Sequence, residues 1–414
     1  MRQASRHVVA GFIGTGKQKE TGSGYEPTTY HFPNQTKHEA SVFGVALLKY
    51  LAAQGRPAQR WLVMGTAQSI WDALVEIVPE TQWASIESVW DEVGQAVREK
   101  AMTQAVLDRW SAALTAAAGL EVVCALVGPA DDRDSQMRVW QAMYEQTGVG
   151  DHLTLDITHG FRHQPVLMTF MATTLRWFRR LARVDMYYGA LELQQRVIEL
   201  PLCNDFLDIA EALATYRYTD DFSQLVNVFG RVTQPEETLL RDLERVAFAD
   251  SVNRFPRHAV EGAQRGLKNC AEGSALDRAL AEALGESVGW ITEPSFAARL
   301  RRKAEAAFES NQLLKGIVLL YEAICVAGCQ RFQTGDPLNY RSRHGAKEAL
   351  ENDPVYKDAF VAVRNLRNSV AHGTAPESAE LHAALDFTNP KAARAQIDGI
   401  VNCGFKLLDD LTAP

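Results

Sequence analysis

The sequence predicts an α/β domain with a mostly parallel sheet, followed by an all-helical region. Short apolar runs alternate with helical patterns over about the first two hundred residues, which is typical of βαβ units. After Pro201 the strand-like runs stop and only helical patterns continue. A length of 414 residues is also too great for one ordinary hydrophobic core.

Composition indicates a globular protein without a strongly basic surface. Hydrophobic residues make up 46% of the chain, and the formal net charge is −8. Such a chain lacks the positive coat of a duplex-binding protein, so any nucleic acid must be bound locally. We find no export signal and no uncharged stretch of membrane-spanning length, and we therefore expect a cytoplasmic protein without membrane contact.

The cysteines do not have the paired spacing of a zinc site. We predict that they are reduced core residues and that the protein needs no metal. The six are Cys124, Cys203, Cys270, Cys325, Cys329 and Cys403.

Six apolar runs in the first half have the length and composition of strands. They are His7–Phe12, Trp61–Met64, Glu121–Val127, Leu153–Ile157, Asp185–Gly189 and Arg196–Leu200. An extended or hairpin segment is predicted over Gly22–Phe32, and a helix from about Glu39 to Ala53. Further helices are predicted from Gln68, after Asp131 and over Pro165–Leu181.

Small and polar residues follow three of these runs. In an open α/β sheet such segments meet at the carboxyl edge of the strands, where ligands bind. Backbone N–H groups, hydroxyls and a few cations there suit an anionic, nucleotide-like ligand, although each residue alone also suits an ordinary turn. No P-loop and no G-x-G-x-x-G occurs, which argues against a nucleoside triphosphatase or a dinucleotide dehydrogenase. The candidate ligand contacts are Gly14, Thr15, Gly16, Lys17, Gly65, Thr66, Asp156, Thr158, His159, Gly160 and Arg162.

The string Asp156-Ile-Thr-His-Gly-Phe-Arg162, with the loops at Gly14 and Gly65, resembles the CARF (CRISPR-associated Rossmann-like) domain of ancillary type III CRISPR proteins. The resemblance covers about the first two hundred residues. It implies a homodimer whose paired sheets bind a cyclic oligoadenylate, most often the tetra-adenylate, across the two-fold axis. A symmetric ring suits a symmetric dimer because each half of the ligand meets the same loops.

The second half reads as a helical connector followed by a helical bundle. Helices are predicted over Asn204–Leu213, Glu236–Phe248 and Ala392–Leu411, with an apolar stripe starting at Leu313. We expect the charge run Arg299–Lys303 to be a solvated helix face, with RNA guidance as the alternative.

A loop is predicted after Thr334. Arg341, Arg343 and His344 behind it are either a second phosphate-contacting group or exposed loop charges.

Near the C-terminus, Val363-Arg-Asn-Leu-Arg-Asn-Ser-Val-Ala-His-Gly373 has the pattern of a helix that ends at a glycine cap. Helical spacing places Arg364, Asn368 and His372 on one stripe, with Arg367 beside it. An imidazole beside a guanidinium and a carboxamide can act on a phosphodiester. The alternative is a capped surface helix whose histidine favours the negative end of the helix dipole.

The motif Arg367-Asn368-Ser-Val-Ala-His372 resembles the R-x4-6-H motif of the HEPN ribonuclease domain, and behind a CARF-like half it resembles the CARF–HEPN ribonucleases of type III CRISPR immunity. This resemblance implies a metal-independent endoribonuclease without a cofactor, activated by a cyclic oligoadenylate and cleaving single-stranded RNA. Arg367, Asn368 and His372 would be catalytic, at a site that two HEPN domains of a homodimer or higher oligomer complete.

Two alternatives remain open at this point. The helical half can be a catalytically silent part of a cyclic-oligonucleotide-binding regulator, or the CARF pocket can itself degrade its ligand. The predicted domains are residues 1–205 (CARF-like), 206–290 (helical connector) and 291–414 (HEPN-like).

Overall fold

The computed structural model describes residues 5–15, 25–252, 254, 257–270, 272–376 and 378–413, without the side chain of Ile291. The chain forms two compact units, Met1–Leu207 and Asp208–Pro414.

The first unit is built on one mixed sheet of eight strands in the order β3-β2-β8-β7-β6-β1-β4-β5. Five neighbouring strands, β7-β6-β1-β4-β5, run parallel, which confirms the mostly parallel sheet. The remaining strands form a partly antiparallel margin. The strands are β1 His7–Phe12, β2 Thr28–His31, β3 Lys37–Ala40, β4 Arg60–Gly65, β5 Glu121–Leu126, β6 His152–Asp156, β7 Arg183–Ala190 and β8 Arg196–Glu199.

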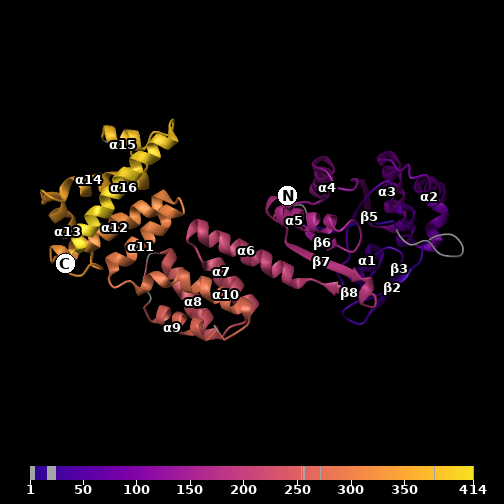
Figure 1. Ribbon diagram of the computed structural model, residues 1–414, viewed down its shortest axis with the longest axis horizontal. Helices are drawn as coiled ribbons and strands as arrows, with labels where there is room; N and C mark the ends of the chain where they lie inside the picture. The colour runs from indigo at the N-terminus through magenta and orange to yellow at the C-terminus, as the bar shows by residue number, and fades with distance from the viewer. Residues whose placement is uncertain are drawn as a thin grey trace. The chain divides into compact units, whose positions relative to one another are not determined.

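Helices cover both faces of this sheet (Figure 1). Because successive side chains of a strand point to opposite faces, Val9 packs in one core while Val8 and Ala10 pack in the other. The first face carries α1 Phe43–Ala53, η1 Trp71–Ile77, α2 Trp83–Arg98 and α3 Gln104–Ala118. The second face carries α4 Arg133–Gln146 and α5 His163–Phe178. Two short 3-10 turns, η2 Glu80–Gln82 and η3 Leu191–Leu193, complete the unit.

Two segments of this unit differ from the sequence prediction. The helix expected from about Glu39 begins at Phe43, because residues 37–40 pair with β2 as the edge strand β3. The segment after Gln68 forms the 3-10 helix η1 rather than an α-helix opening.

The second unit is all-helical. Helix α6 (Pro201–Thr219) leads into it and includes Tyr216–Tyr218, which were expected between two helices. The other elements are α7 Ser223–Thr233, α8 Glu237–Ser251, α9 Arg257–Cys270, α10 Ala275–Ser287, η4 Gly289–Thr292, α11 Phe296–Glu309, α12 Leu313–Arg331, α13 Tyr340–Asn352, α14 Lys357–His372, α15 Ala379–Ala384 and α16 Pro390–Thr412.

Two hydrophobic cores lie in this unit. One is formed by residues between Ile209 and Val288, and the other by residues between Ala297 and Leu411. The functional division at residues 205 and 290 stays a prediction.

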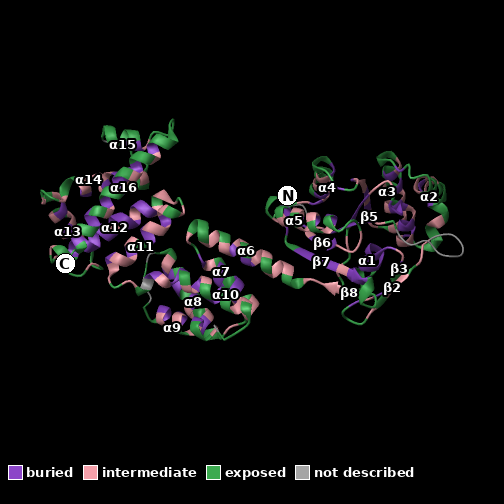
Figure 2. Cartoon of the chain, viewed as in Figure 1, coloured by how far each residue is buried: buried purple, intermediate pink, exposed green. Residues whose placement is uncertain are grey.

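Helix α12 is the centre of the second of these cores (Figure 2). Among the described helices, it alone has the length and hydropathy of a membrane span, and 67% of its apolar window is buried inside the protein. Burial against α11, α13, α14 and α16 is what a core helix requires.

The charge run on α11 is not a uniformly solvated face. Lys303 is 4% exposed and forms an ion pair with Asp250 of α8, while its ammonium also lies 5.1 Å from the centre of the Trp290 ring. Arg301 pairs with Glu305 and Asp409. Lys303 is therefore a buried link between helices, and its burial rules out the alternative of RNA guidance at this residue.

The cysteines are all free thiols, but they are not all core residues. Cys124, Cys325 and Cys329 are buried, whereas Cys403 is exposed on α16. Burial raises the pKa of the Cys124 and Cys325 thiols to about 12, so both stay protonated and inert.

Candidate functional site: a sheet edge and the end of a helix

Strand β1 lies at the topological switch point of the parallel sheet. Its neighbours are β4 on one side and β6 on the other, so the chain winds away from β1 in both directions. Ligands of doubly wound sheets bind in the crevice beyond the carboxyl ends of the strands at such a point. Gly14 follows β1 here, and the Asp156–Arg162 string follows β6.

The strands β1 and β6 approach closely where β6 ends. Gly11 pairs with Asp156, and a methyl group at Gly11 would lie 2.7 Å from Cβ of Asp156. The Asp156 carboxyl is 2% exposed and accepts a hydrogen bond from the Thr158 N–H at 2.8 Å. Burial raises the pKa of Asp156 to about 7, because desolvation outweighs the hydrogen bonds to Thr158.

Thr158 and His159 hold the loop after β6 against β7 and α1. The Thr158 hydroxyl accepts a hydrogen bond from the Gly189 N–H of β7 at 2.8 Å. The His159 Nε2 accepts one from the Phe43 N–H at 3.3 Å. Helix α1 has no side-chain cap of its own at Val42, so His159 satisfies an N–H of its first turn. Burial lowers the pKa of His159 to about 4, and the imidazole is neutral at pH 7.

The loop after β4 is tied to the loop after β1. The Ser69 hydroxyl donates to the Ile13 carbonyl at 2.8 Å and accepts from the Thr66 N–H at 3.0 Å. The Ile70 N–H donates to the Gly14 carbonyl at 3.0 Å. A methyl group at Gly65 would lie 2.8 Å from the Ser69 hydroxyl, so the close packing of the loop requires glycine there.

The loop after β6 ends in a backbone turn that also requires glycine. Gly160 has φ +98°, and a side chain there would meet Gln164 at 2.5 Å. Gln164 is buried, accepts from the Phe161 N–H at 2.9 Å and donates to the Pro129 carbonyl at 3.1 Å. Arg162 at the start of α5 is exposed and makes no hydrogen bond or ion pair with another described residue.

The structure therefore gathers most of the predicted contacts of the first unit at one sheet edge. Sequence reasoning missed two of the residues that hold them in place, Ser69 and Gln164, because a buried serine or glutamine has no pattern of its own. The gathered residues are Gly14, Gly65, Thr66, Asp156, Thr158, His159, Gly160 and Arg162. The exposed Thr15 follows Gly14, whereas Gly16 and Lys17 lie outside the described residues.

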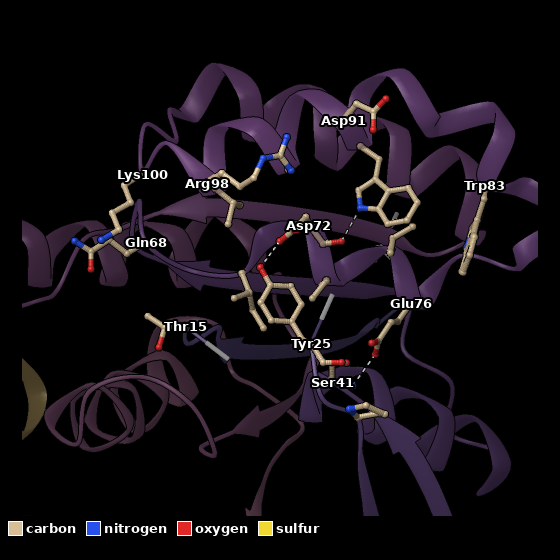
Figure 3. Close-up of a pocket in the computed structure, with 17 residues that line it drawn as sticks. Thr15, Tyr25, Ser41, Gln68, Asp72, Glu76, Trp83, Asp91, Arg98 and Lys100 are labelled. Atoms are coloured by element: carbon tan, nitrogen blue, oxygen red, sulfur yellow. Dashed lines mark hydrogen bonds between the residues drawn. The ribbon is translucent and has the colours of Figure 1, made fainter. Parts of the chain in front are cut away.

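A cavity of about 980 Å³ lies beside this edge (Figure 3). Of the predicted contacts, only Thr15 lines it. Its wall carries the carboxylates Asp72, Glu76 and Asp91, and the Tyr25 hydroxyl donates to Asp72 at 2.9 Å. Arg98 and Lys100 line the same cavity, so its wall carries three carboxylates and two cations and does not exclude an anionic ligand by charge alone.

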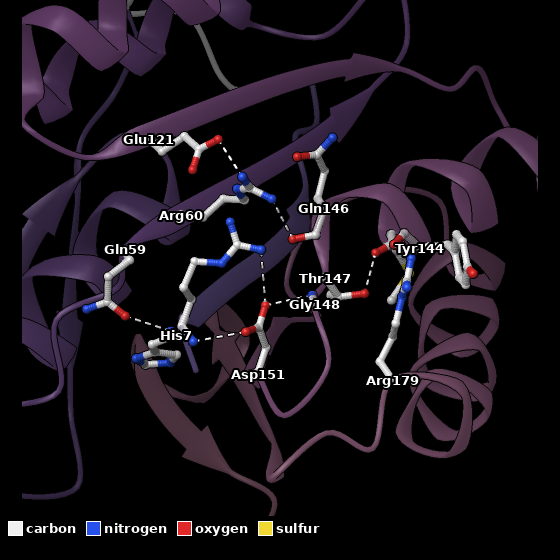
Figure 4. Close-up of polar contacts among 12 residues, drawn as sticks. His7, Gln59, Arg60, Glu121, Tyr144, Gln146, Thr147, Gly148, Asp151 and Arg179 are labelled. Atoms are coloured by element: carbon white, nitrogen blue, oxygen red, sulfur yellow. Dashed lines mark hydrogen bonds and ion pairs between the residues drawn. The ribbon is translucent and has the colours of Figure 1, made fainter. Parts of the chain in front are cut away.

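The opposite edge of the sheet holds a structural network (Figure 4). The Arg6 N–H donates to Asp151 at 2.9 Å, and Arg60 pairs with Glu121 at 2.6 Å. Close by, His152 pairs with Asp185 at 3.0 Å and stacks on His7 with ring centres 4.2 Å apart. These contacts join the starts of neighbouring strands, at the end of the sheet away from the candidate ligand contacts.

The second candidate site is the end of α14. The Arg367 Nη1 donates to the Asn368 Oδ1 and to the His372 Nε2, both at 3.1 Å. An arginine only donates, so the His372 Nε2 accepts and the imidazole carries its proton on Nδ1. His372 is exposed, and Gly373 ends the helix with φ +64°, which confirms the predicted glycine cap.

Arg364 lies on one helical stripe with Asn368 and His372 as predicted, but its guanidinium is bound elsewhere. Arg364 donates to Glu351 of α13 at 2.5 Å and to Asn365 at 3.0 Å, so its guanidinium is held away from His372. Arg367 joins Asn368 and His372 instead.

Helix α13 contains the three charged residues that were expected in a loop. Arg343 pairs with Glu322 of α12, and His344 lies 3.4 Å from Glu348. A guanidinium that is already held by a carboxylate is a weak phosphate ligand, so Arg343 does not suit the predicted phosphate contact. Arg341 is exposed at the start of the helix.

No group of three or more His, Cys, Asp and Glu side chains in the described part of the chain could hold a metal ion. The arrangement at α14 instead offers an imidazole, a guanidinium and a carboxamide. Such groups can orient a phosphodiester and move a proton.

A curated relative and a solved structure resemble this chain, whereas no family model matches it. The sequence is similar to the CRISPR-associated protein MJ1674 of Methanocaldococcus jannaschii, with 20% identity over 380 residues, 84% of this chain and 59% of that protein. The chain thus spans about three fifths of that relative. The structure matches Enterococcus italicus Csm6 bound to cyclic hexa-2'-fluoro-hexa-dAMP, with 11% identity over 99% of this chain and 95% of that one, at a TM-score of 0.35. The chain is therefore similar in sequence to a CRISPR-associated protein.

Proposed function

We propose that this protein is a cyclic oligoadenylate-activated endoribonuclease that cleaves single-stranded RNA in CRISPR antiviral defence. The observation that carries the proposal is the contact of Arg367 with both Asn368 and His372 at the exposed end of α14. The sequence similarity to a CRISPR-associated protein and the loops gathered at the switch point of the sheet support it.

RNA supplies its own nucleophile, so the protein needs only to orient it and to move protons. The 2′-oxygen attacks the adjacent phosphorus and loses its proton, and the bond from phosphorus to the 5′-oxygen breaks as that oxygen gains a proton. The products are a 2′,3′-cyclic phosphate and a 5′-hydroxyl. His372 would transfer a proton, Arg367 would stabilise charge on the phosphate, and Asn368 would fix the guanidinium. No metal is needed for these steps.

The motif at the end of α14 supplies one histidine and one arginine per chain. The reaction moves two protons, one from the 2′-hydroxyl and one to the 5′-oxygen, which favours an active site completed by a second copy of the chain. An apolar face on α5 suits such a homodimer. Val166, Phe170 and Trp177 recur at helical spacing and are 57%, 70% and 63% exposed, which is unusual for side chains of this size. This face begins one turn after Arg162, so a dimer through it would place two copies of the candidate ligand loops near one another.

Activation requires that the ligand bind the active arrangement more tightly than the idle one. The Asp156–Arg162 loop is hydrogen-bonded both to α1, through His159, and to β7, through Thr158. A ligand that moves this loop would therefore also move β7, which pairs with β8 immediately before α6.

The test is RNA cleavage by the purified protein in EDTA, with and without cyclic tetra-adenylate. We expect cleavage only with the ligand, and a loss of at least about 100-fold in rate for His372→Ala or Arg367→Ala. His258→Ala is the matched control, because this histidine is exposed on α9, which packs in the other core of the second unit.

Cleavage that persists in His372→Ala would contradict the assigned catalytic residue. Ligand binding without any RNA cleavage by the wild-type protein would favour the catalytically silent regulator instead. Incubation of the ligand alone, followed by a search for linear products, tests whether the first unit degrades it.

A further inference from the structure

Three helices of the second unit meet around one tyrosine. Tyr321 of α12 is 5% exposed and stacks on Phe360 of α14. The Arg367 guanidinium lies 5.5 Å from the centre of the Tyr321 ring, and the Lys347 ammonium of α13 lies 5.2 Å from the same centre. Two cations from different helices are therefore neighbours of one buried ring.

These two cations differ from the charged residues around them. Each of three nearby basic side chains has a carboxylate partner: Arg343 with Glu322, His344 with Glu348 and Arg364 with Glu351. Neither Lys347 nor Arg367 makes an ion pair with a carboxylate of the described residues.

Like charges that share an aromatic ring repel one another, and the ring attracts each of them without neutralising it. Lys347 is half-buried, so its charge is also partly removed from water. The arrangement becomes favourable when an anion lies between or beside the two cations. The half-buried, unpaired Lys347 therefore suits a phosphate-binding position.

The hydrogen bonds of Arg367 also favour a second cation at this site. An arginine holds a phosphate best with two parallel N–H groups. The Arg367 Nε is buried without a hydrogen-bond partner, and its Nη1 already donates to Asn368 and His372. Among the polar atoms of the guanidinium, Nη2 thus has no partner in the described residues while Nε is buried, which disfavours a bidentate grip and favours a second cation beside it to hold the RNA backbone.

We propose that Lys347 is an RNA-binding residue of the α14 site, contacting a phosphate next to the one that Arg367 holds, with the Tyr321 ring fixing both cations. This inference rests on the proposed ribonuclease function. Lys347 belongs to no sequence motif. The packing of α13 on α12 brings it to the site.

The test measures binding of a fluorescent single-stranded RNA to the His372→Ala protein with cyclic tetra-adenylate, over a range of salt concentrations. Removal of one phosphate contact lowers the slope of log affinity against log salt by about 0.7. We expect this change in Lys347→Gln, with a five- to tenfold weaker affinity at about 0.1 M salt, and its rescue in Lys347→Arg.

Lys357→Gln is the matched control. Lys357 is exposed at the start of the same α14, about 22 Å along the helix from His372, and its removal changes the net charge equally. In the protein with His372 intact, Lys347→Gln should raise KM for RNA more than it lowers kcat.

The outcomes separate the two proposals. If Lys347→Gln and Lys357→Gln have the same salt slope as the parent protein, the role of Lys347 is refuted and the ribonuclease proposal stands. If, with the ligand present, the His372→Ala protein does not bind RNA and the wild-type protein does not cleave it, both proposals fail. Thermal unfolding of each variant shows whether a weaker affinity results from a loss of folding. If Lys347→Gln is unstable, the salt slope of Lys347→Arg still tests whether position 347 acts through its positive charge.

Discussion

Two buried aspartates on neighbouring strands should respond to pH in opposite directions. Asp156 of β6 and Asp185 of β7 are each 2% exposed. Burial raises the pKa of Asp156 to about 7, because it has only the Thr158 N–H and hydroxyl beside it. The pKa of Asp185 is lowered to about 2 despite its burial, because His152, Arg183 and Arg56 donate to its carboxylate.

The raised pKa of Asp156 gives a magnitude for the variant Asp156→Asn. The shift from 3.8 to about 7 corresponds to a cost of about 4 kcal/mol for ionising the buried carboxyl. The folded state holds the proton more tightly than the unfolded state, so this group's contribution to stability is full below pH 3.8 and is lost as the pH rises toward 7. Asparagine resembles the protonated acid and has no charge to bury. The stability of Asp156→Asn relative to wild type should therefore rise by roughly 2–3 kcal/mol from pH 5 to pH 8.

Urea unfolding followed by tryptophan fluorescence measures this difference. Only Trp290 of the eight tryptophans lies beyond Leu207, so the signal reports mainly the first unit. Asp185→Asn is the control of opposite sign: it removes a carboxylate that the folded state prefers, and it should destabilise the protein by about 2 kcal/mol at both pH values. An unfolding difference between Asp156→Asn and wild type that is the same at pH 5 and pH 8 would refute the buried-acid explanation.

Three further predictions concern other parts of the first unit and its surface. Burial lowers the pKa of His7 to about 4, so its contribution to stability is lost as the pH falls below about 6.5. Urea unfolding should show that wild type loses about 2 kcal/mol of stability relative to His7→Asn between pH 7 and pH 5. Gly65→Ala should destabilise the protein by about 1–3 kcal/mol in calorimetry, because its methyl group would lie 2.7 Å from the Trp71 ring. Gly285→Ala is the control, because its methyl group would meet no atom within 4 Å. Equal melting temperatures of the two variants would contradict this prediction. If the proposed homodimer forms through α5, Phe170→Glu should shift it to monomer in light scattering, and Phe387→Glu, at an 89% exposed position of the second unit, should leave it unchanged.

Local patterns predicted the central strands well because a strand buried on both faces is a continuous apolar run. The strand Lys37–Ala40 was missed because an edge strand with Lys, His and Glu lacks that run. Helix α6 begins at Pro201, where the strand-like runs end, but it continues through Tyr216–Tyr218 because packing against the first core of the second unit extends it.

The candidate sites were predictable to the extent that their residues are adjacent in sequence. Asp156, Thr158 and His159 form one string, and Arg367, Asn368 and His372 form another. Residues contributed by packing gave no signal, because the role of Ser69 depends on Ile13 and that of Lys347 depends on Tyr321. Helical spacing placed Arg364 on one stripe with Asn368 and His372, but it contains no information about Glu351 on the neighbouring helix, which binds the Arg364 guanidinium.

The charges at the two sites imply different responses to salt. Around the switch point, His159 is neutral, Asp156 is near its pKa at neutral pH, and Arg162 is the one full charge among the described predicted contacts. A ligand there would be bound mainly by backbone N–H groups and hydroxyls, whose hydrogen bonds do not release counterions. At α14, Arg367 and Lys347 have no carboxylate partner among the described residues and would meet RNA phosphates directly, and such contacts weaken steeply as salt rises. Moderate salt should therefore weaken RNA binding before it weakens ligand binding, so that activation and cleavage can be measured separately in one protein.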